Sequence, residues 1–195
     1  MNKEYTWSYL KDCKIRIKHL LSLLEGKIQE NDVVLDVGCG YSPLGRELIE
    51  KVKKIIGFDT SKETIAFLKE NYKEGMWKKC TAKTFFENKT NWDKTNILLN
   101  IGWNPEKNFN FLISRYIEVQ KPKLILNEIG IPIDWEIKDS IYVCKEKNTR
   151  INSFNKLTNE LIQKDYNLIK TINFNSKTKT RCSNRLALLF KKKNN

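Results

Sequence analysis

The sequence of 195 residues has no apolar run that approaches the length of a membrane span, so no membrane-spanning segment is expected. Its first residues, Met1 to Glu4, lack the hydrophobic region of a secretory signal peptide. The five cysteines have no Cys-x-x-Cys spacing, which predicts reduced thiols in a cytoplasmic protein and no zinc site. His19 is the only histidine and has no evident acidic partner, so a histidine general base is not expected.

Arginine is scarce, although the chain carries a formal net charge of +13. Only six of its 36 basic residues are arginine, the side chain preferred for phosphates and base edges. Lysine, asparagine and isoleucine share A/T-rich codons, so genome composition can raise the charge without selection for a polyanionic partner. The total charge is therefore a weak indication of nucleic-acid binding, and the position of the charges matters more.

The segment 33–40, Val-Val-Leu-Asp-Val-Gly-Cys-Gly, is the most informative stretch of the chain. Its β-branched apolar residues predict a buried strand, and the glycines predict a tight turn directly after it. Asp36 places one fixed negative charge beside backbone amides that the glycines leave open to a ligand. This combination predicts a small-molecule site at the end of the first strand.

A dinucleotide site is the obvious alternative, but the spacing argues against it. The dinucleotide fingerprint needs Gly-x-Gly-x-x-Gly, whereas Gly45 follows Gly40 two residues too late. Asp36 would also repel a pyrophosphate. The segment instead resembles the first motif of class I S-adenosylmethionine (SAM) methyltransferases, an acidic residue followed by Gly-x-Gly.

This resemblance implies a SAM site formed by the turn and its neighbours. The turn of Gly38, Cys39 and Gly40, followed by Tyr41, would lie against the methionine part of SAM, with Asp36 near its ammonium.

A second strand, 52–59, ends in Asp59, and Thr60 follows it. An acid at this position can accept hydrogen bonds from both hydroxyls of an adenosine ribose. The alternative is a surface acid at a strand end. Ser61 is expected to cap the helix that begins at Lys62.

The pattern of the remaining chain predicts strands that alternate with helices, hence an α/β fold with a doubly wound, mostly parallel sheet. The closing strand–loop–strand matches the hairpin of the methyltransferase fold, which implies seven strands in the order 3-2-1-4-5-7-6 with helices on both faces. We expect a single domain, with a helical segment at 1–29 and the core at 30–192. The expected helices are 5–25, 43–52, 62–72, 109–119 and 151–163, and the expected strands after the second are 76–80, 95–100, 124–126, 168–174 and 186–190.

Two further places are candidates because ligands bind outside the carboxyl ends of parallel strands. Thr81 and Ala82 stand where the family usually has an acid that contacts adenine, although Thr81 could equally be an ordinary turn residue. Asn100 and Trp103 match the Asn and the aromatic residue of adenine amino-methyltransferases, in which the Asn accepts from an amine and the aromatic stacks on a flipped base. Gly102 departs from the proline of that motif, and a capping Asn with a core Trp is the alternative.

The loop 175–181 is basic and is expected beside the substrate, whereas Lys191 to Lys193 are expected to form a solvated tail at the opposite end. A basic rim favours an anionic acceptor, and a plain solubilising turn is the alternative for this loop. The sequence therefore predicts a SAM-dependent methyltransferase, with RNA or DNA as the favoured substrate class. A small-molecule methyltransferase, a protein methyltransferase and a non-catalytic SAM-binding subunit remain alternatives.

Overall fold

The structure is a computed structural model of the chain. It describes residues 3–88, 94–101, 109–131, 136–138, 141–143, 149–177 and 182–194. Within these ranges, no helix is both long enough and apolar enough to cross a membrane.

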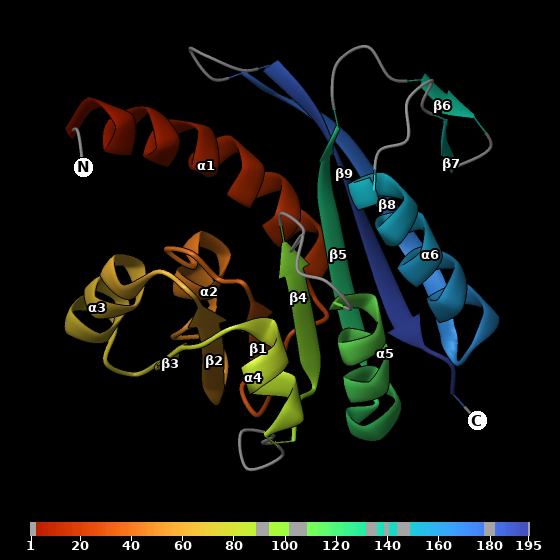
Figure 1. The fold of residues 1–195 in the computed structure, drawn as a ribbon, viewed down its shortest axis with the longest axis horizontal. Helices are drawn as coiled ribbons and strands as arrows, with labels where there is room; N and C mark the ends of the chain where they lie inside the picture. Colours follow the sequence, from red (N-terminus) through yellow and green to blue (C-terminus); the bar gives the residue numbers. More distant parts are fainter. Residues whose placement is uncertain are drawn as a thin grey trace.

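One sheet of seven strands organises the molecule (Figure 1). Its order is β3-β2-β1-β4-β5-β9-β8, and because β8 and β9 are its sixth and seventh strands, the predicted order 3-2-1-4-5-7-6 is confirmed. The first five strands pair in parallel, and β9 runs antiparallel to both of its neighbours. The strands are β1 (Val33–Val37), β2 (Lys54–Asp59), β3 (Met76–Lys79), β4 (Ile97–Ile101), β5 (Leu124–Ile131), β8 (Tyr166–Lys177) and β9 (Cys182–Lys192).

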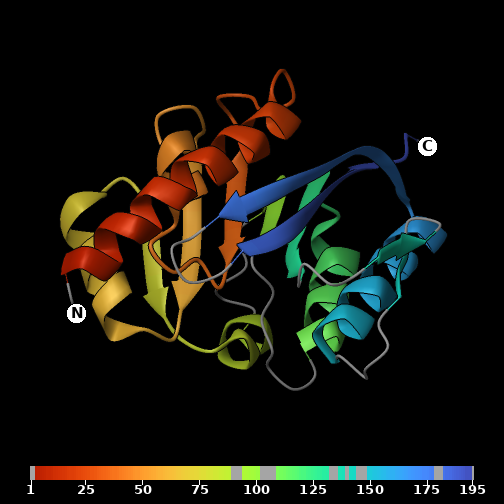
Figure 2. The same cartoon turned by 90° about the horizontal axis from the view of Figure 1, so that it is seen from above.

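Helices cover both faces of this sheet, as the fold class predicted. Figure 2 shows α1 on the opposite side of the sheet from α5 and α6. One apolar cluster joins the first three helices to one face, and a second joins the last three helices to the other. The helices are α1 (Lys3–Leu24), α2 (Pro43–Leu48), α3 (Lys62–Asn71), α4 (Ala82–Glu87), α5 (Phe109–Gln120) and α6 (Thr149–Gln163).

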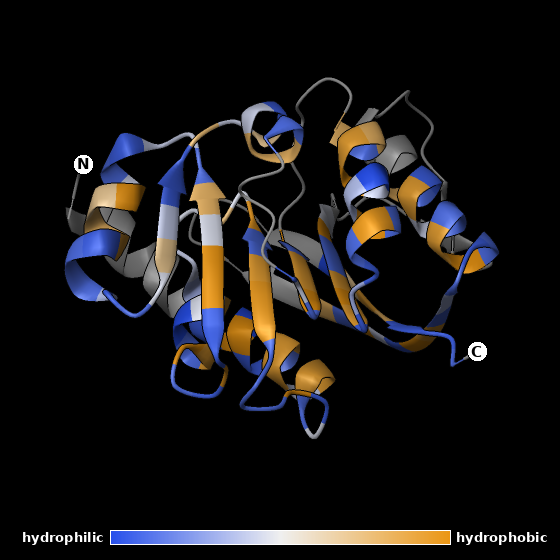
Figure 3. Cartoon of the chain, turned by 90° about the horizontal axis from the view of Figure 1, so that it is seen from below, coloured by the Kyte–Doolittle hydropathy of each residue, from blue (hydrophilic) through white to orange (hydrophobic). Residues whose placement is uncertain are grey.

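The sheet is apolar through its centre, where hydrophobic residues follow one another along the strands (Figure 3). Val34, Leu35, Ile55 and Leu98 are fully buried, because parallel strands covered on both faces have no solvent side. Burial of such side chains supplies about 1.5–3 kcal/mol each. The central strands are thus held rigidly, and they fix the loops that follow them.

Several element boundaries differ from the sequence prediction. The short helix α4 and the small hairpin of β6 (Glu136–Lys138) and β7 (Ile141–Val143) were not predicted. Strand β5 runs to Ile131 and β4 to Ile101, each beyond its apolar core, because backbone pairing continues through polar residues.

The closing hairpin is also longer than its apolar segments. Strands β8 and β9 pair from Tyr166 with Lys192 to Lys177 with Cys182, which leaves a much shorter connection than the predicted polar loop.

Candidate functional site

The carboxyl ends of β1, β2, β4 and β5 meet at one edge of the sheet. In the register of the sheet, Val37 lies beside Asn100, and Asn100 lies beside Asn127. On the other side, the amide of Cys39 donates to the carbonyl of Phe58 at 2.9 Å. The loops after these strands are therefore neighbours, as the rule for parallel sheets requires.

The turn after β1 is held open by its glycines. Gly38 and Gly40 have φ of +60° and +50°, a backbone region that residues other than glycine rarely adopt. A Cβ built on either glycine meets nothing within 4 Å, so open space lies against this stretch of backbone. The turn thus presents bare main chain to that space, which is what close approach of a ligand needs.

Asp36 is buried at the end of β1 and contacts the same loop. The hydroxyl of Ser42 donates to Oδ2 of Asp36 at 2.6 Å. The backbone of Ser42 is in the left-handed region, with φ 45°. Ser42 precedes α2 but makes no capping hydrogen bond with its side chain, which is committed to Asp36. A Cβ on Gly45 would lie 2.1 Å from Ser42 Oγ, so Gly45 leaves the space that this contact occupies.

Burial dominates the ionisation of the groups in this loop. It raises the pKa of Asp36 from its ordinary 3.8 to about 7, against opposing effects of the Ser42 hydroxyl and the Arg16 guanidinium. Burial, together with the charges of Asp36 and Asp59, also raises the pKa of the Cys39 thiol. Cys39 therefore remains a thiol and does not have the thiolate character of a nucleophile.

Asp59 ends β2 and ties two loops together. Its Oδ2 accepts from the amide of Gly40 at 3.0 Å, and its Oδ1 accepts from the amide of Ser61 at 2.8 Å. A carboxylate oxygen accepts two hydrogen bonds, so among the described residues each oxygen has one acceptor position left. The carboxylate is half-buried beside the open turn, which suits a ligand with two adjacent hydroxyls.

The residues that flank this carboxylate differ in exposure. Thr60 is exposed, and Ser61 caps α3 by accepting from the amide of Thr64, as predicted. Tyr41 is half-buried and packs edge-on against Phe67, with 5.3 Å between the ring centroids. Partial burial, the negative charge of Glu63 and a hydrogen bond with Glu63 raise the pKa of Tyr41.

Thr81 and Ala82 lie at the start of α4, next to the end of β2. The amide of Cys80 donates to the carbonyl of Asp59 at 3.0 Å, which brings this turn to the same edge. Thr81 is exposed, and its hydroxyl accepts from the amide of Thr84 as a helix cap, while Ala82 is buried. The turn-residue interpretation of Thr81 thus has a direct structural basis.

Asn100 lies within β4 and forms a buried amide pair with Asn127 on β5. Its Nδ2 donates to Asn127 Oδ1 at 2.7 Å. Asn127 Nδ2 is fully buried and finds no hydrogen-bond partner among the described residues. Trp103, the other half of the predicted motif, lies outside the described residues, as do Lys179 and Arg181 of the basic loop.

A second polar cluster at this edge was not predicted. Glu128 on β5 is fully buried between two arginines, Arg16 of α1 and Arg185 of β9. Arg16 Nε lies 2.9 Å from Oε1 of Glu128, and Arg185 Nη1 lies 3.0 Å from the same oxygen. A charged residue inside an apolar strand implies a buried counter-charge. Glu128, within the mostly apolar run from Leu124 to Ile131, was the sequence feature that could have indicated this cluster.

The sequence also led us to expect no zinc site and no histidine general base. Among the residues that the structure describes, no group of three or more His, Cys, Asp or Glu could hold a metal ion. His19 stacks on Phe174 with 4.9 Å between the ring centroids.

The fold and this edge define a class of protein, the SAM-dependent methyltransferases, whose cofactor is SAM. The chain belongs to a methyltransferase domain family, whose profile matches residues 28–185. No curated protein matches the sequence significantly.

Solved structures show the same fold at low sequence identity. The N-methyltransferase NodS from Bradyrhizobium japonicum is 10% identical, with a TM-score of 0.67 over 93% of this chain and 96% of that one. An rRNA methylase from Streptococcus thermophilus is 8% identical, with a TM-score of 0.58 over 86% of this chain and 90% of that one. TrmK of M. capricolum, determined with the cofactor product S-adenosyl-homocysteine, is 10% identical, with a TM-score of 0.57 over 91% and 67%.

Proposed function

We propose that SAM binds across the carboxyl ends of β1 and β2. The methionine part would lie on the turn from Gly38 to Tyr41, where bare backbone faces open space. The carboxylate of Asp36 would attract the ammonium group, which favours the ionised form of this buried acid. Because Asp36 lies behind Ser42, we expect it to act on the ammonium through its charge and through the shape it gives the loop.

The ribose would lie on Asp59. Its two oxygens already orient the amides of Gly40 and Ser61 and each retain one acceptor position, which two neighbouring hydroxyls would fill. Thr60, Thr81 and Ala82 would border the adenine, with the Thr81 hydroxyl and nearby amides in place of the family's acid. SAM supplies a methyl group on a cationic sulfonium, and the protein's contribution is to position the acceptor and exclude water.

We also propose a nucleic acid as the acceptor, and the observation that carries this is the fixed amide of Asn100. Its Nδ2 is committed to Asn127, which leaves Oδ1 as an acceptor suited to the N–H of an exocyclic amine. Asn100 lies one residue before the end of β4, at the edge where the acceptor must enter. Trp103 would stack on the base. Among the structural neighbours, the rRNA methylase is consistent with such an acceptor.

A small-molecule acceptor is the second candidate, because the same amide could bind the amine of a metabolite. The likeness to NodS, an N-methyltransferase, is compatible with it. Incubation with SAM labelled on its methyl group, in lysate that is rich in RNA or depleted of it, separates the two. Label in the RNA fraction, lost on Asn100→Ala, supports the nucleic acid. Label only in small molecules contradicts it.

A further inference from the structure

The opposite edge of the sheet carries a lysine cluster that the cofactor site does not use. Lys123, Lys191, Lys192 and Lys193, with Asn194, line a surface hollow of about 480 Å³. The hollow lies where β5 begins and β9 ends, since Lys191 pairs with Leu124. We name Lys191, Lys192 and Lys193 the amino-edge lysines.

These lysines are held by the sheet and are not the solvated tail that the sequence predicted. Lys191 and Lys192 belong to β9, and the amide of Lys192 donates to the carbonyl of Lys123 at 3.0 Å. The amide of Lys193 donates to the carbonyl of Asp165. Residues that look like a polar tail are therefore fixed in place, because the strand pairing extends past the apolar Phe190.

The local charge is largely uncompensated. Lys123 is neutralised by Asp32, with 2.8 Å between Nζ and Oδ1. In the described part of the chain, no carboxylate lies within ion-pair distance of an amino-edge lysine; Lys193 Nζ donates only to the carbonyl of Lys164. These unpaired positive charges attract a polyanion, and its binding releases the counterions condensed on it.

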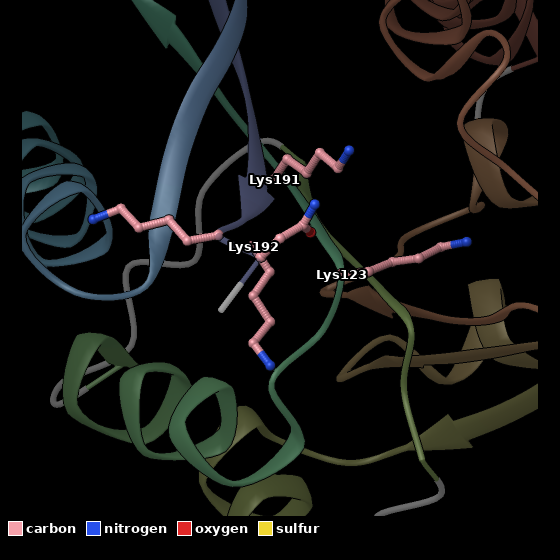
Figure 4. A pocket seen from close by; sticks show the side chains of 5 residues that line it. Lys123, Lys191 and Lys192 are labelled. Atoms are coloured by element: carbon pink, nitrogen blue, oxygen red, sulfur yellow. The ribbon is translucent and has the colours of Figure 1, made fainter.

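The arrangement fits many phosphates better than one. The lysine side chains labelled in Figure 4 do not converge on a single point, as they would around one chelated anion. The edge strand β8 leads from this hollow to the carboxyl edge of the sheet, with exposed Lys170 on the way. Its 12 residues span about 40 Å at the usual rise of a strand.

We propose that the amino-edge lysines bind the phosphate backbone of a polynucleotide whose methylated base lies at the opposite edge. This rests on the proposed nucleic-acid acceptor and adds a second contact that contributes affinity without reading sequence. The contact would place the acceptor along β8, from the hollow toward the carboxyl edge of the sheet.

The test replaces the three amino-edge lysines with glutamine, which keeps their aliphatic stems and leaves the Lys123–Asp32 pair intact. A matched control replaces Lys51, Lys69 and Lys73, three exposed lysines elsewhere, and lowers the net charge equally. Binding of a labelled single-stranded RNA of mixed sequence is measured over a range of salt concentrations. Calorimetry with SAM and circular dichroism confirm that each variant is folded.

We expect the amino-edge variant to bind RNA about tenfold more weakly at low salt, with the salt slope smaller by about 2, while the control changes little. Equal losses in both variants would overturn the proposal, because they would indicate general charge attraction only. Binding of anionic lipid vesicles in place of RNA, lost in the amino-edge variant, would overturn it as well.

A third variant, Lys177→Ala with Lys179→Ala and Arg181→Ala, separates this proposal from the proposed function. If only this loop variant loses RNA affinity, the amino-edge contact is wrong and the nucleic-acid acceptor stands. If only the amino-edge variant loses affinity, the second contact stands, and the basic loop takes no part in RNA binding. The acceptor proposal itself fails separately, if no label from SAM enters the RNA fraction.

Discussion

Arg16 on α1 donates two hydrogen bonds, from Nε and Nη2, to Glu128 on β5, which lies 112 residues further along the chain. This pair holds the first helix against the carboxyl edge of the sheet. Arg185 completes the cluster from the other side of the same carboxylate. One buried carboxylate thus pairs with two guanidinium groups that have little exposure.

Removal of this carboxylate should be costly. We expect Glu128→Ala to lower the free energy of unfolding by about 3–5 kcal/mol, because it removes the carboxylate that two poorly solvated guanidinium groups contact. Urea denaturation measures the loss. Glu128→Gln, which keeps the shape and one acceptor oxygen, should lose less. Glu118→Ala, which breaks an exposed pair with Lys164, is the control, and an effect no larger than in this control would contradict the account.

The ionisation of Asp36 should give stability a particular dependence on pH. Its pKa is about 7 in the folded protein and 3.8 ordinarily, so the folded state retains a proton that the unfolded chain has lost. The free energy of unfolding therefore falls as pH rises from about 4 to about 7, by on the order of 4 kcal/mol from this group alone.

Asp36→Asn removes this contribution, and urea denaturation of both proteins at several pH values isolates it. The variant should gain stability relative to wild type as pH rises through this window. Parallel curves for the two proteins would show that Asp36 is ionised throughout. Added SAM should reduce the difference in stability between the variant and wild type near neutral pH, since its ammonium favours the carboxylate form of Asp36.

At Gly45, the steric clash of an added Cβ should outweigh the gain in helix propensity that alanine brings. A Cβ at this position would lie 2.1 Å from Ser42 Oγ and 3.3 Å from Asp36 Oδ2. We expect Gly45→Ala to lower the free energy of unfolding by about 1–3 kcal/mol and to weaken SAM binding, because Ser42 must move away from Asp36. In Gly130→Ala the nearest atom lies at 3.6 Å, so this variant is the control for thermal unfolding and calorimetry. Similar results for both variants would refute the role given to Gly45.

Asp59 should contribute to SAM affinity chiefly through its charge. Asp59→Asn should weaken SAM binding by about 1.5–3 kcal/mol, measured by calorimetry, since the hydrogen bonds to the ribose lose their charge assistance. It should also lower stability slightly, because the new amide can accept from only one of Gly40 and Ser61 through its single oxygen. Unchanged affinity in the folded variant would place the ribose elsewhere.

The sequence was sufficient to predict the fold, because its strands are short apolar runs separated by helical patterns. The glycine turn after Val37 and the acid at Asp59 could be placed at the ends of their strands in the same way, because each directly follows or ends an apolar run. Family membership confirms the class of enzyme that these motifs indicated. The residue-level assignments to SAM remain predictions.

Contacts between distant segments could not be predicted in this way. Periodicity does not reveal that Arg16 reaches Glu128, or that Asn127 pairs with Asn100, because these depend on the register of the sheet. Strand ends were also misjudged where pairing continues into polar residues, as at Lys191 and Lys192. Apolar pattern marks the core of a strand, whereas backbone hydrogen bonding sets its length.

Calorimetric titration of the purified chain with SAM, and separately with NAD, tests the central claim most directly. The account predicts that SAM binds with a dissociation constant of about 1 mM or lower, a free energy of at least about 4 kcal/mol in magnitude, while NAD gives no signal. Asp59→Asn should weaken the SAM titration without unfolding the protein. Tight binding of NAD with no response to SAM would contradict the account.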